Sequence, residues 1–247
     1  MKHIYLLLIL LCVTSVSFTS TAQTRRSTTR DAVLVFSKTA GFRHQSIPTG
    51  RTALYQLGQK NNFRVDTTED ASVFTYDNLR KYKTIVFLST TGDILNQEQQ
   101  AAFEQYIQKG GGFVGIHAAA DTEYEWPWYN KLVGAYFLHH PKQQNAIIHV
   151  WNREHPTVSF LPERWKRFDE WYSYKSIQPG IKVLATLDES TYEGGRNGRN
   201  HPFIWYHEYD GGRAFYTGGG HTNESFEEPL FMKHVLEGIK WTMKRTK

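Results

Sequence analysis

The chain has 247 residues, with 29 basic and 24 acidic side chains, 40% hydrophobic residues and a single cysteine. A chain of this length can bury a full core, and its composition is not that of a disordered protein. The net charge of +5 is modest, and Arg25, Arg26 and Arg30 contribute to it from a Ser/Thr-rich N-terminal stretch. We therefore expect a globular protein with no nucleic-acid partner.

The first 22 residues have the layout of a secretion signal. Lys2 and His3 precede an apolar run over residues 4–13, and small and polar residues follow up to Ala22. This layout predicts a signal peptide over residues 1–22 with cleavage after Ala22, and hence a secreted or periplasmic protein. The apolar run is about half as long as the roughly 20 residues that a membrane-spanning helix needs. We expect no membrane insertion of the mature chain.

The only cysteine, Cys12, lies within the predicted signal peptide. The mature chain would then contain no disulfide, no thiolate metal site and no cysteine nucleophile. Residues 23–31 have the composition of a flexible tail, and no linker divides residues 32–247. We therefore predict a single domain over residues 32–247.

Strands and helices alternate in the first half of the predicted domain. The apolar run at residues 32–36 has the length of a strand, and Ser46 and Pro48 mark the start of a helix. Further strands are expected at residues 64–67, 84–89 and 113–117, with a helix that begins after Asn96 and ends at glycines 110–112. This alternation predicts an α/β fold, in which a parallel sheet is covered by helices on both faces.

The pattern of the second half is less regular. Strands are expected at residues 147–151, 183–187, 203–207 and 214–217, and an amphipathic helix at residues 227–244. Residues 121–169 are rich in Trp, Tyr, His and Pro, and their pattern assigns little beyond the first of these strands. The sequence thus predicts one α/β domain with elaborated loops.

Titratable side chains lie directly after several predicted strands. His44 follows the first strand, Asp93 follows the third, His117 ends the fourth with Asp121 behind it, and His221 follows the last. In an open parallel sheet, the loops at the carboxyl ends of the strands face one crevice. The sequence therefore predicts that these three histidines and two aspartates converge at one edge. A structural role, such as a hydrogen bond from a buried imidazole to the backbone, stays open for each histidine.

A second group of candidates surrounds the acidic pair Asp169-Glu170. Neighbouring side chains of an extended segment point to opposite faces, so only one of the pair is expected to reach a given pocket. Aromatic side chains near the histidines would offer flat apolar faces to a sugar, although some of them must belong to the core. The candidates for substrate binding are Trp126, Trp128, Tyr129, His140, Asp169, Tyr172 and Trp205.

Several of these segments together resemble the motifs of the ThuA-like family, which is named for trehalose utilisation. The matching segments are residues 41–47, residues 110–119, His140-Pro141, His155-Pro156, residues 169–172 and residues 219–221. The resemblance implies a flavodoxin-like sheet with flanking helices, related to class I glutamine amidotransferases. It also implies a role in carbohydrate metabolism, with disaccharides or their keto derivatives as substrates.

The chain differs from the amidotransferases at the position of their cysteine nucleophile. Those relatives carry a Gly-x-Cys-x-Gly pattern, whereas the corresponding stretch here is Gly115-Ile-His-Ala-Ala119. No thiolate can form at His117, so glutamine hydrolysis through a thioester is excluded.

Three functions from different classes remain: an enzyme, a carbohydrate-binding module and a scaffold domain of a larger secreted assembly. The first is an enzyme that acts on a carbohydrate, and its candidate catalytic residues are His44, His117, His221, Asp93, Asp121 and Glu170. Histidine suits proton transfer near neutral pH, and two carboxylates would suit a glycosidase. Three imidazoles and a carboxylate would also hold a divalent metal such as zinc, although no His-x-x-x-His motif is present. The second is a carbohydrate-binding module without catalysis.

Overall fold

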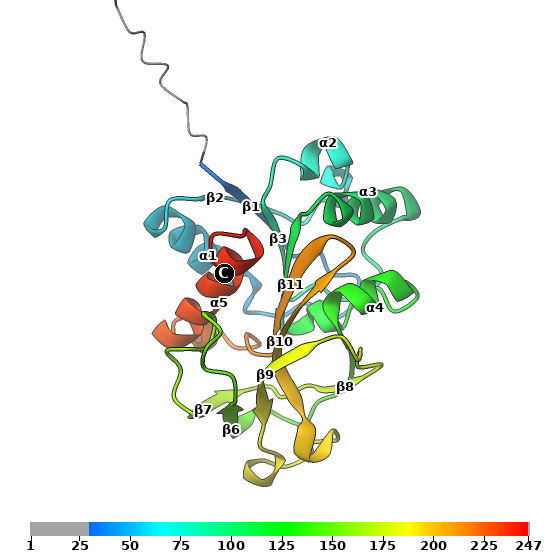
Figure 1. Ribbon diagram of the computed structural model, residues 1–247. Helices are drawn as coiled ribbons and strands as arrows, with labels where there is room; N and C mark the ends of the chain where they lie inside the picture. The colour runs from blue at the N-terminus through cyan, green and yellow to red at the C-terminus, as the bar shows by residue number, and fades with distance from the viewer. Residues whose placement is uncertain (1–29, 247) are drawn as a thin grey trace, which may run out of the picture.

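The computed structural model describes residues 30–246, so the predicted signal peptide and most of the predicted tail lie outside the described residues. Nine strands form one sheet in the order β2-β1-β3-β4-β11-β10-β9-β6-β7 (Figure 1). The strands are β1 (Ala32–Phe36), β2 (Arg64–Thr68), β3 (Thr84–Leu88), β4 (Gly112–Ile116), β6 (Gln144–Val150), β7 (Arg164–Asp169), β9 (Lys182–Leu187), β10 (Pro202–Tyr209) and β11 (Gly212–Thr217). Two further strands, β5 (Tyr136–His139) and β8 (Ser173–Lys175), pair with each other.

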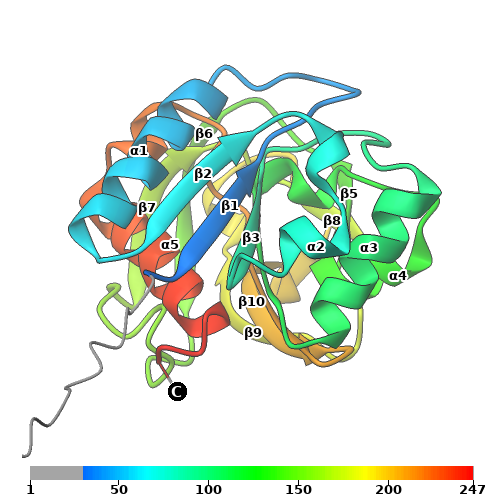
Figure 2. The ribbon, with the colours of Figure 1, turned by 90° about the horizontal axis from the view of Figure 1, so that it is seen from above.

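Helices cover both faces of the parallel part of the sheet, as predicted. The helices are α1 (Ile47–Lys60), α2 (Tyr76–Leu79), α3 (Gln97–Gln108), α4 (Pro127–Val133) and α5 (Pro229–Thr242). Figure 2 shows α1 and α5 on one side of the sheet and α2, α3 and α4 on the other. Val33 packs in the core under α1 and α5, whereas its neighbour Leu34 packs under the other helices. Every residue of β1, β3 and β4 is therefore buried.

The local signals in the sequence explain where these helices begin. Asn96 accepts a hydrogen bond from the backbone N–H of Gln99, and the Gln99 side chain accepts one from the N–H of Asn96. This reciprocal capping box fixes the start of α3 at the predicted position. The start of α1 is also as predicted, with Pro48 in its first turn.

The sheet is parallel in its first half, as predicted, and antiparallel in its second half. Strands β2, β1, β3, β4 and β11 are parallel, whereas β10, β9, β6 and β7 pair antiparallel. The change of direction occurs at the β10–β11 hairpin, whose turn contains Asp210 and Gly211 with positive φ angles. Two adjacent residues with positive φ are typical of the tight turn that matches the twist of a hairpin.

The antiparallel half curls back toward the parallel half. Strand β7 is four strands away from β11 in the sheet order, which would separate them by about 19 Å if the sheet were flat. The backbone N–H of Gly220 nevertheless donates to Asp169 at the end of β7, at 2.9 Å. The three residues after Thr217, from Gly218 to Gly220, can span only about 10 Å, which falls short of this separation even with the hydrogen bond added, so the sheet must curve. This curvature brings the end of β7 to the carboxyl edge of the parallel strands.

Within residues 30–246, no helix is both long enough and apolar enough to cross a membrane.

Candidate metal centre

Three predicted histidines lie together at the carboxyl edge of the parallel strands. The ring of His44 lies 4.9 Å from that of His117 and 5.0 Å from that of His221, measured between ring centres. The rings of His117 and His221 are 5.1 Å apart. His44 comes from the loop after β1, His117 from the end of β4 and His221 from the loop after β11. The prediction that the sheet topology brings these imidazoles to one edge is confirmed.

The backbone around His117 forms a sharp turn. The strand ends at Ile116, one residue earlier than predicted, and His117 has a φ of 51° and begins a short 3-10 helix. A non-glycine residue in this conformation is strained, and such strain is typical of functional sites. The hydroxyl of Tyr216 donates to the carbonyl of His117 at 2.7 Å, which holds the turn.

The ring of His117 is also held in one orientation. Its Nδ1 lies 3.0 Å from the carbonyl oxygen of Gly218, and the ring of Tyr172 packs 4.2 Å from it. Because a carbonyl only accepts, Nδ1 must carry the proton and donate. The lone pair of the neutral ring therefore resides on Nε2, which points at the other candidate residues. A hydrogen bond from the remote ring nitrogen is the usual way in which proteins orient a metal-binding histidine.

The loops that carry the other two histidines are fastened to each other. The hydroxyl of Ser46 donates to the carbonyl of Gly220 at 3.0 Å instead of capping α1. Gly220 has a φ of 115°, a backbone conformation that residues with a Cβ rarely adopt. This turn and its bond to Ser46 hold His44 and His221 at fixed positions relative to each other.

Glu170 completes the cluster from the antiparallel half of the sheet. One of its carboxylate oxygens, Oε2, lies 3.0 Å from Nδ1 of His221 and 3.5 Å from Nε2 of His117. Burial alone would raise the pKa of Glu170, but the imidazoles of His117 and His221 beside its carboxylate outweigh burial and hold the pKa well below its usual range. The carboxyl group is therefore ionised at neutral pH.

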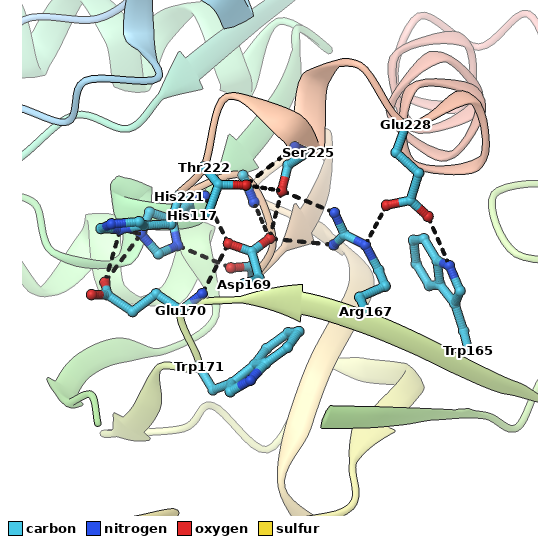
Figure 3. Close-up of polar contacts among 12 residues, drawn as sticks. His117, Trp165, Arg167, Asp169, Glu170, Trp171, His221, Thr222, Ser225 and Glu228 are labelled. Atoms are coloured by element: carbon cyan, nitrogen blue, oxygen red, sulfur yellow. Dashed lines mark hydrogen bonds and ion pairs between the residues drawn. The ribbon is translucent and has the colours of Figure 1, made fainter. Parts of the chain in front are cut away.

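Asp169 supports this arrangement from its place between the cluster and Arg167 (Figure 3). Its side chain is fully buried and accepts hydrogen bonds from the backbone N–H groups of Glu170, Gly220 and His221, at 2.9, 2.9 and 3.1 Å. As expected for neighbours in an extended segment, only Glu170 of the acidic pair reaches the histidines. This burial corrects the expectation that Asp169 binds substrate directly, because its oxygens hold the backbone of two candidate ligands instead.

A buried arginine completes the support of Asp169. Nη1 of Arg167 lies 3.4 Å from Asp169, and its Nε donates to Glu228 at 2.6 Å (Figure 3). The hydroxyl of Ser225 donates to Asp169 at 2.8 Å and accepts from Arg167 at 3.0 Å. Arg167, Ser225 and Glu228 were not among the site residues predicted from the sequence. The alternating pattern of β7 was the available signal, since it places Arg167 on the same inward face as Trp165 and Asp169.

The fourth member, His44, is neutral. Burial, together with the nearby His117 and His221, lowers the pKa of His44 to about 2. Its Nδ1 is buried and has no hydrogen-bond partner among the described residues. A neutral imidazole is the form that binds metal ions, and an unpartnered buried nitrogen is costly unless a ligand satisfies it.

The donor set fits a divalent metal ion. One atom each from His44, His117, Glu170 and His221 lies within 4.8 Å of all the others. Tetrahedral zinc with bonds of about 2.1 Å places its ligand atoms about 3.4 Å apart. The distances between the ligand atoms of His117, Glu170 and His221 range from 3.0 to 3.5 Å, close to this value. Imidazole and carboxylate ligands suit zinc and several other transition metals.

Three further predicted residues lie around this cluster. Nδ1 of His140 lies 3.0 Å from the second oxygen of Glu170, and the side chain of His140 is 43% exposed. Tyr172 packs against both His117 and His140. Asp121 accepts a hydrogen bond from Tyr124, and burial raises the pKa of Asp121 despite this bond.

The other predicted residues lie elsewhere. Asp93 is exposed and does not belong to the cluster. Trp126, Tyr129 and Trp205 are buried in the core, and Trp128 packs against it. This placement corrects the expectation that these aromatic faces receive a sugar. The physical reason is that these rings pack against other rings of the core: Tyr129 packs on Phe87 of β3 and Phe113 of β4, and Trp128 packs on Phe103 of α3.

Comparison with known proteins agrees with this architecture. The profile of the ThuA family, described as trehalose utilisation, matches residues 32–242. The chain belongs to the ThuA family. Family membership links it to carbohydrate utilisation at the level of the family, and the predicted α/β fold is the fold of its structural neighbours. No curated protein matches the chain significantly.

Two solved structures of ThuA-like proteins are similar over most of the chain. The protein from Bacteroides uniformis is 25% identical, with a TM-score of 0.73, and the match covers 86% of this chain and 91% of that one. The protein from Parabacteroides merdae is 23% identical, with a TM-score of 0.74, and the match covers 88% and 91%. A β-galactosidase from Bacillus circulans sp. alkalophilus shares the fold over 31% of its own length, at 11% identity and a TM-score of 0.57.

Proposed function

We propose that this ThuA family member is a metal-dependent enzyme that acts on a carbohydrate. The observation that carries the proposal is the convergence of His44, His117, His221 and Glu170, with one ligand atom from each within 4.8 Å of the others. The link of the family to carbohydrate utilisation supports the substrate class. A secreted or periplasmic location, expected from residues 1–22, belongs to the same proposal.

A divalent ion at this centre would supply a Lewis acid that polarises a carbonyl or hydroxyl oxygen of the sugar. Glu170 and the three histidines are held in place by hydrogen bonds within the protein. Asp169 holds the backbone of Glu170 and His221, the carbonyl of Gly218 holds the ring of His117, and Ser46 ties the loop of His44 to Gly220. Such rigid positioning is what metal affinity and catalysis require of the residues around a site.

His140 is the side chain best placed to move a proton. Its Nδ1 lies 2.9 Å from the carbonyl of Pro141 and 3.0 Å from Glu170, so this nitrogen carries a proton and donates it. Nε2 of the neutral ring then holds a lone pair and can accept a proton from a sugar hydroxyl or from a carbon beside a keto group. Asp121, whose pKa is raised by burial, is the second candidate for this role.

The competing function is a carbohydrate-binding module without catalysis. Under that reading, the imidazoles only donate hydrogen bonds to the sugar and need no ion. The contact between His221 and Glu170 at 3.0 Å is compatible with a simple hydrogen bond, so it favours neither function. The unpartnered Nδ1 of His44 favours the metal-dependent enzyme.

The test compares the purified protein with its His117→Ala variant and with a Tyr55→Ala control, which removes an exposed ring on α1. Metal content is measured by elemental analysis after loading with zinc. Turnover of a panel of disaccharides and their 3-keto derivatives is then followed by product analysis, with and without a chelator.

We expect about one ion per chain in the wild type and in Tyr55→Ala, and little in His117→Ala. We also expect turnover that a chelator abolishes and zinc restores. Turnover that survives complete metal removal would refute the metal-dependent mechanism. Sugar binding with no turnover of any compound would establish the binding module instead.

A further inference from the structure

A pocket of about 650 Å³ opens beside the metal centre, and His221 belongs to both. This volume is within the range of sites that bind small molecules and is large enough for a disaccharide. The pocket lies between the loop after β1, the end of β7 and the loop after β11. A sugar bound here would have one end next to the candidate metal ligands.

Two exposed phenylalanine rings line this pocket. Phe42 is 65% exposed and Phe168 is 51% exposed. Phe168 takes an outward position of β7, where Arg164 and Lys166 take the two preceding outward positions. The ring of Phe42 packs edge-on against His44, with 4.9 Å between ring centres. Exposed apolar groups that gather at a concave site are typical of a ligand-binding surface.

The polar groups of the pocket are nearly all neutral. Gln45, Gln143 and Asn223 contribute side-chain amides, which both donate and accept hydrogen bonds as sugar hydroxyls do. Among residues 30–246, Glu224 is the only acidic residue of the lining, and no lysine or arginine belongs to it. An anionic group on the sugar ring in this pocket would therefore find no cationic partner among these lining residues and would be repelled by Glu224.

The nearby Arg43 does not change this balance. Both terminal nitrogens of its guanidinium donate to Glu69, at 2.8 and 2.9 Å. Arg51 also donates to Glu69, at 2.9 Å. These contacts engage the guanidinium groups of Arg43 and Arg51 outside the pocket.

We propose that this pocket is a subsite for a neutral sugar ring, which packs its apolar C–H face on Phe42 and Phe168. The subsite selects uncharged disaccharides over sugar phosphates and uronic acids. It places the neighbouring sugar unit next to the metal centre, so the inference rests on the proposed function for what happens there. The aromatic platforms expected at Trp126 and Trp205 are replaced by these two phenylalanines.

The test is isothermal titration calorimetry of the full chain with defined probes. Trehalose, maltose, cellobiose and lactose serve as neutral disaccharides, and trehalose 6-phosphate and glucuronic acid serve as charged probes. Each titration is run on zinc-loaded and on chelator-treated protein. The variants are Phe42→Ala and Phe168→Ala, with Tyr55→Ala as a control that removes an equally exposed ring outside the pocket.

We expect at least one neutral disaccharide to bind, and trehalose 6-phosphate to bind at least tenfold more weakly than that disaccharide. Each phenylalanine variant should weaken binding about tenfold, because an aromatic face is lost, while Tyr55→Ala should bind as the wild type does. Far-UV circular dichroism checks that the variants are folded, as expected for exposed positions.

Three results would overturn the inference: no binding of any neutral disaccharide, equal or tighter binding of a charged probe, or unchanged affinity in both phenylalanine variants. Failure of the proposed function gives a different result. A protein that binds no zinc but loses sugar affinity in Phe42→Ala keeps the subsite and loses only the metal-dependent mechanism.

Discussion

Replacing Asp169 by asparagine should weaken both the fold and the metal centre, although Asp169 touches neither solvent nor the candidate ligand atoms. The carboxylate accepts four hydrogen bonds, from three backbone N–H groups and from Ser225, and faces the buried Arg167. An asparagine amide replaces one accepting oxygen by a donor, which then opposes N–H groups. It also removes the negative charge beside the guanidinium.

The magnitude follows from these contacts. Breaking a buried ion pair costs about 3–5 kcal/mol, and hydrogen bonds to a charged group contribute about 1.5–3 kcal/mol each. Arg167 keeps its contact with Glu228 at 2.6 Å, so we expect the lower end, a loss of about 3 kcal/mol in the free energy of unfolding. Displacement of Glu170 and His221 should lower zinc affinity about 10–100-fold.

The assay combines urea unfolding with competition for zinc against a chromogenic chelator. Asp77→Asn is the matched control, because Asp77 is 87% exposed and pairs only with the exposed Arg80. The control should change the free energy of unfolding by less than about 0.5 kcal/mol. Asp169→Asn with wild-type stability and wild-type zinc affinity would refute the reasoning that Asp169 positions the ligands.

Three further predictions concern other parts of the molecule. Burial lowers the pKa of His234 from 6.5 to about 4. Between these two pH values the imidazole is protonated in the unfolded chain but not in the folded one, so lowering the pH favours unfolding. His234 should therefore lower the free energy of unfolding by about 3 kcal/mol from pH 7 to pH 4. Urea unfolding across this range should show a smaller decline in His234→Gln, and an equal decline would contradict the assignment. Gly220→Ala should cost about 1–3 kcal/mol in unfolding free energy, since its φ is 115°, and should lower zinc affinity through His221; unchanged values of both would exclude a role for the turn. Trp205→Phe should lower the unfolding free energy by about 1–3 kcal/mol because its indole N–H donates to Val133, and calorimetry should find sugar affinity unchanged; weakened sugar binding with intact folding would restore Trp205 as a platform.

The parallel half of the fold was predictable because its signals are local. Continuous apolar runs such as residues 84–88 give buried strands, and a cap such as Asn96 gives the start of a helix. The general rule for parallel sheets then places His44, His117 and His221 at one edge without any tertiary information.

The antiparallel half was harder to predict because its determinants are tertiary. Strand β7 has the sequence Arg-Trp-Lys-Arg-Phe-Asp, in which a buried arginine occupies a core position. Arg167 is tolerated there only because Asp169 and Glu228 face it, and Glu228 lies far away in the sequence. The exposed Phe168 and the buried Trp126 likewise cannot be distinguished by residue type. Phe168 takes an outward position of β7, whereas Trp126, at the start of α4, packs against Phe103 and Trp128.

The curvature of the sheet has a consequence for local opening of the fold. The three histidines follow strands of the parallel half of the sheet, whereas Glu170 follows β7, an edge strand of the antiparallel half. Edge strands open locally at a lower free-energy cost than central ones, and a ligand that binds only the closed form suppresses such opening. A bound ion would therefore link the two halves of the sheet, and amide hydrogen exchange in β7 would slow when the ion binds.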